Sequence, residues 1–313
     1  MLHPSLRELE DLARHCTSLA QATGILVETQ ELLRNAVEHS TDEAELIAWY
    51  SRVICGVFDS PACAARPSSR RIIPAGALAR LELLPGSPLG WSQWLDDESV
   101  AADPSFSQRF EAMIQAGHLS PVEAQRIPGA DLCAHLDAVL SGDDAQKAAD
   151  LVDQLAFLAA YRPGIAQNLP AHASGLLFRL VLEARPPVVR THQGLPDTAQ
   201  RVHVEDDLVE PVAAIARWAA SLAGCPVRGT LARLSSAAQR GVLHVDEAEE
   251  LERIWRTGVR IRLQRWVERV ADHPATLAHL PATQRSAYGA AARSLAACID
   301  ALRSRTSAIS SDG

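Results

Sequence analysis

The chain has 313 residues, of which 47% are apolar and 22% are charged, a composition typical of a globular protein with room for about two domains. Its formal net charge is −8. This acidic balance excludes charge-driven binding to nucleic acids or to anionic membranes, because both require a basic surface.

Residues 1–60 are predicted to form an N-terminal helical region, since their apolar residues recur at helical spacing. Ser40 and Glu43 have the spacing of a capping box, which predicts the start of a third helix. The first turns contain acids and no apolar core, so we do not expect a secretory signal. The stretch at 59–71 is rich in Pro, Ser and Ala and is the predicted boundary of this region.

Residues 61–168 are predicted to form a small α/β core. The stretch at 72–98, IIPAGALARLELLPGSPLGWSQWLDDE, predicts a strand, a Gly turn, a short helix, a Pro-Gly-Ser turn and a second strand. Ser120, Pro121 and Glu123 have the pattern of an N-cap, N1 and N3 set, and this pattern predicts the start of a helix.

Residues 169–304 are predicted to be mostly helical. The run GLLFRLVLEA fits a helix or a strand by periodicity alone. Gly224 and Gly241 follow helical patterns and are expected just beyond helix C-termini. Residues 305–313 are predicted to form a disordered tail. The whole chain is therefore expected to have an α+β fold that is predominantly α-helical.

One long helix in this region is predicted to start at an Asp246-x-x-Glu249 box and to carry an apolar stripe with Trp255 and Leu263. Arginines lie beside or opposite the stripe, at positions 253, 256, 260, 262, 265 and 269. They fit either an anion-binding helix or a core helix with solvated arginines. We favour the core helix, because long basic side chains commonly cover apolar surface with their stems.

Sequence motifs for metals, disulfides and membranes are missing from the chain. The six cysteines form no C-x-x-C pair and the eleven histidines form no H-E-x-x-H motif. No window approaches the roughly 18 consecutive apolar residues that a membrane span requires. We therefore expect a cytoplasmic protein with reduced thiols, no resident cofactor, and a nucleotide or a protein as its partner, with homo- or hetero-oligomers both open.

Taken in order, the C-terminal elements resemble a bacterial family related to the PII-protein uridylyltransferases, which act in signalling. The similarity lies in DLVEPVAAIARWAASLAG, in the Gly-Thr-Leu-x-Arg-Leu turn at 229–234, and in the closing helix LPATQRSAYGAAARSLAACIDAL. It extends over about residues 5–303. This resemblance implies a polymerase-β-like nucleotidyltransferase core followed by a helical substrate-binding domain.

The catalytic signature of such enzymes reads Gly-Ser, then Arg and Glu on a short helix, then Ser-Asp-x-Asp. The positions that match it, and that the resemblance implies for nucleotide or phosphate binding, are Gly76, Arg80, Glu82 and Ser87. Ala77 replaces the serine, and Pro88 and Gly90 replace both aspartates. These three positions are vestigial, so the resemblance implies no catalytic residue and no metal ligand at this turn.

The missing aspartates matter because nucleotidyl transfer requires Mg²⁺ to neutralise charge on the triphosphate. Two acids at i and i+2 of a strand share a face and can ligate one ion. Pro88 and Gly90 supply no side-chain oxygen. Asp96, Asp97 and Glu98 follow too far along the strand to replace them.

Three functions remain open. The first, which we favour, is a non-catalytic relative that binds a nucleotide or a partner protein and acts as a regulator. The second is an active protein uridylyl- or adenylyltransferase that uses Mg²⁺ and other acids, for which Asp59, Asp131, Asp143 and Asp144 are available. The third is a helical protein-interaction module that has no connection with nucleotides.

Overall fold

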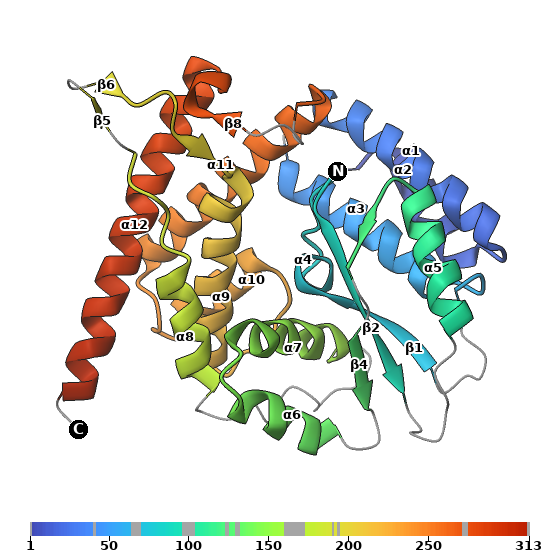
Figure 1. The fold of residues 1–313 in the computed structure, drawn as a ribbon, viewed down its shortest axis with the longest axis horizontal. Helices are drawn as coiled ribbons and strands as arrows, with labels where there is room; N and C mark the ends of the chain where they lie inside the picture. The colour runs from blue at the N-terminus through green and yellow to red at the C-terminus, as the bar shows by residue number, and fades with distance from the viewer. Residues whose placement is uncertain are drawn as a thin grey trace. The chain divides into compact units, whose positions relative to one another are not determined.

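The computed structural model describes residues 2–39, 42–63, 70–95, 104–122, 125–128, 132–159, 173–189, 191–192, 195–270 and 275–311. The chain divides into two compact units. The first comprises Met1–Gly142 and Asp150–Ala166, and the second comprises Asp143–Ala149 and Gln167–Gly313. Helices dominate and the sheets are small (Figure 1), so the predicted α+β fold class with predominant helix is confirmed.

The first unit begins with three helices, as the apolar spacing predicts: α1 (Pro4–His15), α2 (Leu19–His39) and α3 (Glu43–Phe58). The N-cap of α3 is Asp42, whose carboxylate accepts hydrogen bonds from the backbone N–H groups of residues 44 and 45. The predicted N-cap, Ser40, lies outside the described residues. Asp42 is nearer to the first helical turn and satisfies its free N–H groups directly.

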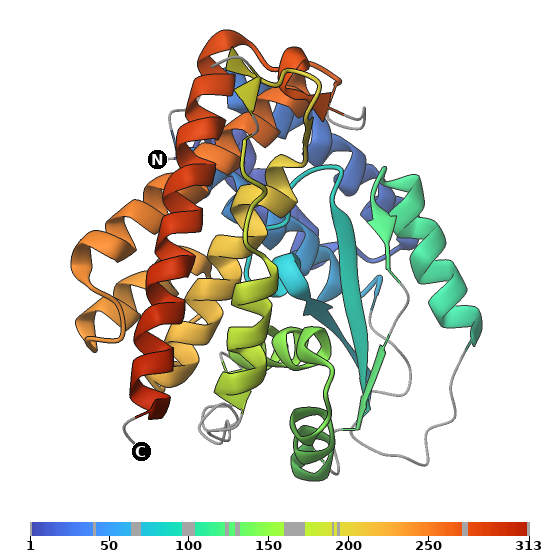
Figure 2. The ribbon, with the colours of Figure 1, turned by 60° about the vertical axis from the view of Figure 1, so that its left-hand side comes forward.

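A small sheet follows, and one strand pairs with all the others in it (Figure 2). Strand β2 (Pro88–Leu95) runs antiparallel to β1 (Arg70–Ala75) and parallel to β3 (Ser120–Pro121) and β4 (Gln125–Pro128). The single-turn helix α4 (Gly76–Ala79) connects β1 to the turn before β2. The predicted order of strand, turn, short helix, turn and strand is therefore confirmed.

The helix predicted to start at Ser120 is wrong. Residues 120–121 and 125–128 are strands that pair with β2, and the backbone N–H of Val122 donates to the carbonyl of Leu89 at 2.9 Å. The capping pattern is a local signal, and here the ladder with β2 overrides it. Glu123 lies outside the described residues. The remaining helices of this part of the chain are α5 (Pro104–Ala116), α6 (Leu132–Ser141) and α7 (Ala145–Leu158).

The second unit consists mainly of helices. Its longer elements are α8 (Ala173–Glu183), α9 (Glu210–Leu222), α10 (Thr230–Gln239), α11 (Val245–Val267) and α12 (Ala282–Ser311). Its short elements are β5 (Thr191–His192), β6 (Leu195–Pro196), β7 (Arg201–Val202), the π-helix η1 (Glu205–Val209), β8 (Ala275–Thr276) and the 3₁₀-helix η2 (Leu277–His279).

Several local predictions for the second unit can be compared with these bounds. The ambiguous run GLLFRLVLEA is helical, within α8. Gly224 and Gly241 have φ of +62° and +75° just beyond the ends of α9 and α10, as a left-handed C-terminal glycine should. Helix α11 begins after His244, whose backbone N–H donates to Glu247, so the predicted Asp246–Glu249 box is wrong by two residues. Helix α12 continues to Ser311, into the residues predicted as a tail.

The arginines of α11 serve structural roles in most of the described cases. Arg253 and Arg256 pair with acids one turn earlier on the same helix, and Arg262 pairs with Glu205 at 3.2 Å. Arg265 is buried and donates to the carbonyl of Val270. These contacts support the interpretation of α11 as a core helix rather than an anion-binding one.

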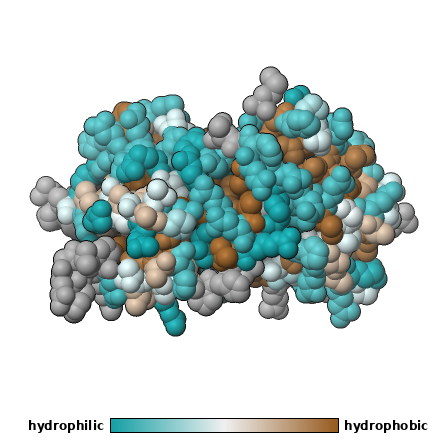
Figure 3. All heavy atoms as spheres, turned by 90° about the horizontal axis from the view of Figure 1, so that it is seen from above, coloured by the Kyte–Doolittle hydropathy of each residue, from teal (hydrophilic) through white to brown (hydrophobic). Residues whose placement is uncertain are grey.

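The surface is mixed in polarity. Figure 3 shows a face on which apolar residues lie among mainly hydrophilic ones. In the described residues the exposed large apolar side chains come from well-separated segments: Leu12, Val122, Val188, Leu222 and Val245. Single exposed apolar residues of this kind are normal on a globular surface. None of the described helices is both long and apolar enough to cross a membrane.

Candidate functional site

The candidate site is the turn that runs from β1 through α4 to β2 in the first unit. Gly76 begins α4 with φ +55°, a left-handed conformation that favours glycine. Leu81 has φ +62°, which is uncommon for a residue with a side chain, and the backbone N–H of Glu82 donates to the carbonyl of Ala77 at 2.9 Å. The sequence therefore folds here into one tight helical turn.

The matched arginine and glutamate lie inside this turn, in a cluster that we call the Arg80 triad: Arg80, Glu82 and Asp153. Arg80 Nε lies 3.0 Å from Glu82 Oε2, and Arg80 Nη1 lies 2.9 Å from Asp153 Oδ2. All three side chains are buried, with Asp153 fully so. A buried guanidinium with two carboxylate partners is expected to be held firmly, because breaking a buried ion pair typically costs about 3–5 kcal/mol.

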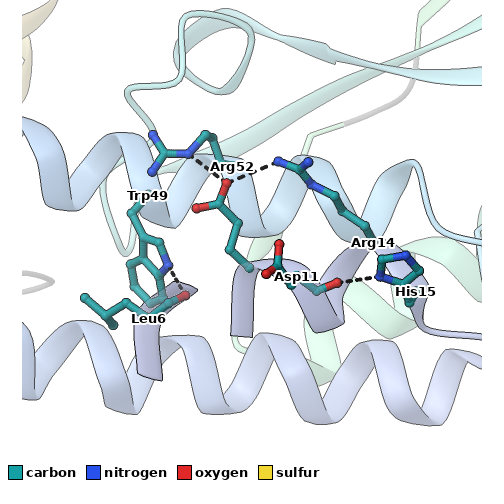
Figure 4. Close-up of polar contacts among 7 residues, drawn as sticks. Leu6, Asp11, Arg14, His15, Trp49 and Arg52 are labelled. Atoms are coloured by element: carbon teal, nitrogen blue, oxygen red, sulfur yellow. Dashed lines mark hydrogen bonds and ion pairs between the residues drawn. The ribbon is translucent and has the colours of Figure 1, made fainter. Parts of the chain in front are cut away.

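Helix α3 supports the same turn from within the first unit. Ser51 is fully buried, and its hydroxyl accepts the backbone N–H of Leu83 at 3.0 Å. Helix α3 is in turn joined to α1, because Trp49 Nε1 donates to the carbonyl of Leu6 at 2.7 Å and Glu10 accepts from Arg52 at 2.9 Å (Figure 4). The turn is thus anchored to a rigid helical layer.

The three vestigial positions are placed differently from one another. Ala77 is half-buried, and Pro88 is exposed at the first position of β2, where its missing N–H is tolerated. Gly90 pairs with Ala75 across the sheet. A Cβ atom at position 90 would lie 3.2 Å from Ala75 Cβ and 3.3 Å from the Ala75 carbonyl oxygen. Position 90 is therefore tightly packed as well as lacking an oxygen ligand.

Helix α7 is hydrogen-bonded to the same face of β2. The strand period of two places Ser92 and Trp94 on the same face as positions 88 and 90. Both are buried, and the Ser92 hydroxyl accepts from Gln154 Nε2 at 2.6 Å. Consecutive residues of α7, Asp153 and Gln154, therefore contact the turn and the strand. Ser87, the remaining matched position, is also buried.

The structure describes three of the other acids named from the sequence. Asp59 is the exposed C-cap residue of α3, and Asp143 and Asp144 belong to the second unit. Asp131 and the acids at 96–98 lie outside the described residues. In the part of the chain that the structure describes, no group of three or more His, Cys, Asp or Glu side chains could hold a metal ion.

Asp153 and Gln154 were missed by sequence reasoning, although a signal for them exists. Both lie in the helix DLVDQLAFL, where nearly every neighbour is apolar and buried. Acidic side chains are almost never fully buried unless they are paired, so a polar doublet inside such a run indicates buried partners. The pattern does not identify which residue the partner is.

The second unit contains another buried carboxylate, in the short helix η1 that precedes α9. Asp207 Oδ2 accepts from Tyr288 Oη at 2.7 Å and from the His203 backbone N–H at 2.8 Å. Burial raises the pKa of the Asp207 carboxyl above its ordinary value, although the Tyr288 hydrogen bond opposes this. Asp207 lies in η1. Gly258 of α11 packs closely against η1, so that a Cβ atom at position 258 would lie 2.8 Å from Val209 Cγ2.

A comparison with protein-family models matches residues 174–303, within the second unit, to a family described as "Putative nucleotidyltransferase substrate binding domain". The matched residues include α9, α10, α11 and the Asp207–Tyr288 contact. No curated protein matches the chain. The family match supports a nucleotidyltransferase-like protein.

Proposed function

We propose that this chain is a divergent relative of the PII-uridylyltransferase-like nucleotidyltransferases that has lost nucleotidyl transfer and acts as a regulator by binding a nucleotide or a partner protein. The observation that carries the proposal is the chemistry of one turn. Its two metal-ligand positions are Pro88 and Gly90, and its retained Arg80 and Glu82 are buried in ion pairs.

The Arg80 triad is the reason for preferring this function to an active enzyme. Two carboxylates, Glu82 and Asp153, do converge near α4, as an enzyme with relocated acids would need. Their oxygens contact the Arg80 guanidinium, and both side chains are buried. Mg²⁺ usually retains several waters and binds through substrate phosphates, so it requires carboxylates that a hydrated ion can reach.

The family match supports the other half of the proposal. A substrate-binding domain can keep its fold and its ligand after the adjoining catalytic turn has lost its metal ligands, because each unit has its own core. A chain of this kind would recognise what an active relative recognises and would compete with it or regulate it.

The direct test is pyrophosphate release. The purified chain is incubated with Mg²⁺ or Mn²⁺ and each of the four nucleoside triphosphates, with and without a candidate acceptor protein. We expect rates equal to the protein-free background. Turnover above background that Glu82→Gln abolishes, and that the exposed-site control Arg71→Gln retains, would reject the proposal in favour of an active transferase.

Binding is tested separately by thermal unfolding with the same nucleotides. A ligand at a hundred times its Kd that binds only the folded state adds about 2.7 kcal/mol. We expect any nucleotide stabilisation to be the same with Mg²⁺ and with EDTA, because the carboxylates that would couple the metal to the nucleotide are missing. Stabilisation that depends strictly on Mg²⁺ contradicts the proposed loss of the metal site.

A further inference from the structure

A cavity of about 280 Å³ lies in the second unit, between α12 and the segment that follows α8. One wall is formed by the apolar residues Pro187, Val188 and Val189. The α12 wall is formed by small residues, Ala292, Ala296 and Ala297, which lie along one side of the helix over about one and a half turns. The cavity is therefore apolar along its length.

The cavity is open to solvent, and so is one apolar side chain of its wall. Val188 is 65% exposed. Burying such a side chain against a ligand is favourable by about 25 cal/mol for each Å² of apolar surface removed from water. The site therefore offers a ligand a hydrophobic driving force.

The two ends of the cavity differ in charge. At one end Arg185 makes a bidentate ion pair with Asp300, with distances of 3.1 and 2.8 Å, so the Arg185 guanidinium there is already paired with a carboxylate. At the other end is Arg293, an exposed residue for which no hydrogen bond or ion pair is found among the described residues. An anionic group is therefore attracted to the Arg293 end of the cavity, which orients a ligand along it.

We propose that this cavity binds a small organic anion with an apolar body, its anionic group at Arg293 and its body against Val188 and Ala297. The volume favours a small molecule, since it is close to the lower end of ligand pockets at about 300 Å³. A stable protein partner would need far more surface, about 800 Å² on each side. The proposal is independent of the nucleotidyltransferase function proposed above.

The test uses octanoate as the probe, measured by isothermal titration without nucleotide or metal. Two controls separate the contributions: 1-octanol has the apolar body without the charge, and inorganic phosphate has charge without the body. We expect saturable octanoate binding, weaker octanol binding and no phosphate binding. Failure of octanoate to bind at millimolar concentration overturns the proposal and leaves the pyrophosphate test unaffected.

Two variants locate the binding. Arg293→Gln should weaken octanoate about tenfold and leave octanol unchanged, whereas Arg240→Gln, an exposed arginine outside the cavity, should change neither. Ala297→Leu places a larger side chain at an exposed position of the α12 wall and should abolish binding of both probes. Octanoate binding that survives Ala297→Leu, or that Arg240→Gln weakens as much as Arg293→Gln, contradicts the assignment to this cavity.

Discussion

The two units each bury a carboxylate, but they compensate its charge in different ways. In the first unit Asp153 is fully buried and faces the guanidinium of Arg80 at 2.9 Å. In the second unit Asp207 accepts hydrogen bonds from the Tyr288 hydroxyl and the His203 backbone N–H. The first carboxylate is paired with a cation, and the second relies on neutral donors.

In the first unit Arg80 and Glu82 are buried, and the ion pair of Arg80 with Asp153 joins α7 to the turn before β2. In the second unit, which contains the family match, burial raises the pKa of the Asp207 carboxyl. The comparison leads to three predictions, which are given in order of decreasing expected effect.

The largest effect is expected from Arg80→Met. This change removes the guanidinium that both Glu82 and Asp153 contact, and breaking a buried ion pair destabilises a protein by about 3–5 kcal/mol. Urea denaturation measures the change in the free energy of unfolding. The matched control is Arg71→Met on β1, where the side chain is exposed and the expected change is within about 0.5 kcal/mol.

The origin of that effect can be isolated. Adding Glu82→Gln and Asp153→Asn to Arg80→Met removes the uncompensated negative charges. If charge compensation is what the Arg80 triad provides, the triple variant is more stable than Arg80→Met alone. A triple variant that is no more stable would indicate lost packing of the arginine stem instead.

A smaller effect is expected from Tyr288→Phe. The change removes one of the two donors to Asp207 and leaves a buried acceptor less satisfied, at a cost of about 1–3 kcal/mol. It should also raise the pKa of Asp207 further, because the Tyr288 hydrogen bond lowers it. A double-mutant cycle with Asp207→Asn measures the coupling. Additive effects would show that the hydroxyl and the carboxylate do not interact.

The smallest effect at neutral pH is expected from Asp207→Asn, and its sign depends on pH. Burial raises the Asp207 pKa in the folded state, so the folded state binds more protons than the unfolded one between the two pKa values. The contribution of Asp207 to stability is then greatest below the unfolded pKa of about 3.9 and is lost as pH rises through the folded pKa. Asparagine can accept the same two hydrogen bonds and does not titrate.

We therefore expect the stability of Asp207→Asn relative to the unmodified protein to increase from about pH 4 upward and then to level off. Thermal unfolding of both proteins across this pH range measures the difference in their stability. The other acids titrate equally in the two proteins, so their contributions cancel in this difference. A difference that is constant with pH would mean that Asp207 has the same pKa folded and unfolded.

The sequence predicts much of the order of helices and strands in this protein, and few of the contacts between residues that are far apart in the chain. The helix and strand order around Gly76 follows from local apolar spacing and turn residues, which act over a few positions. The start of β3 at Ser120 was mistaken for a helix because the ladder with β2, about 30 residues earlier, is not visible in local pattern. The Arg80–Asp153 pair spans 73 residues, so no spacing rule could find it.

The close approach of Gly90 to Ala75 has a consequence for how this turn can change over time. The Cβ atom of an aspartate introduced there requires Ala75 to shift by a few tenths of an ångström, and one acid without its companion at position 88 makes a poor Mg²⁺ ligand set. A change of Gly90 to aspartate alone is thus expected to lower fold stability without restoring a metal site. Under the function proposed above, the packing at position 90 makes a loss of catalysis hard to reverse.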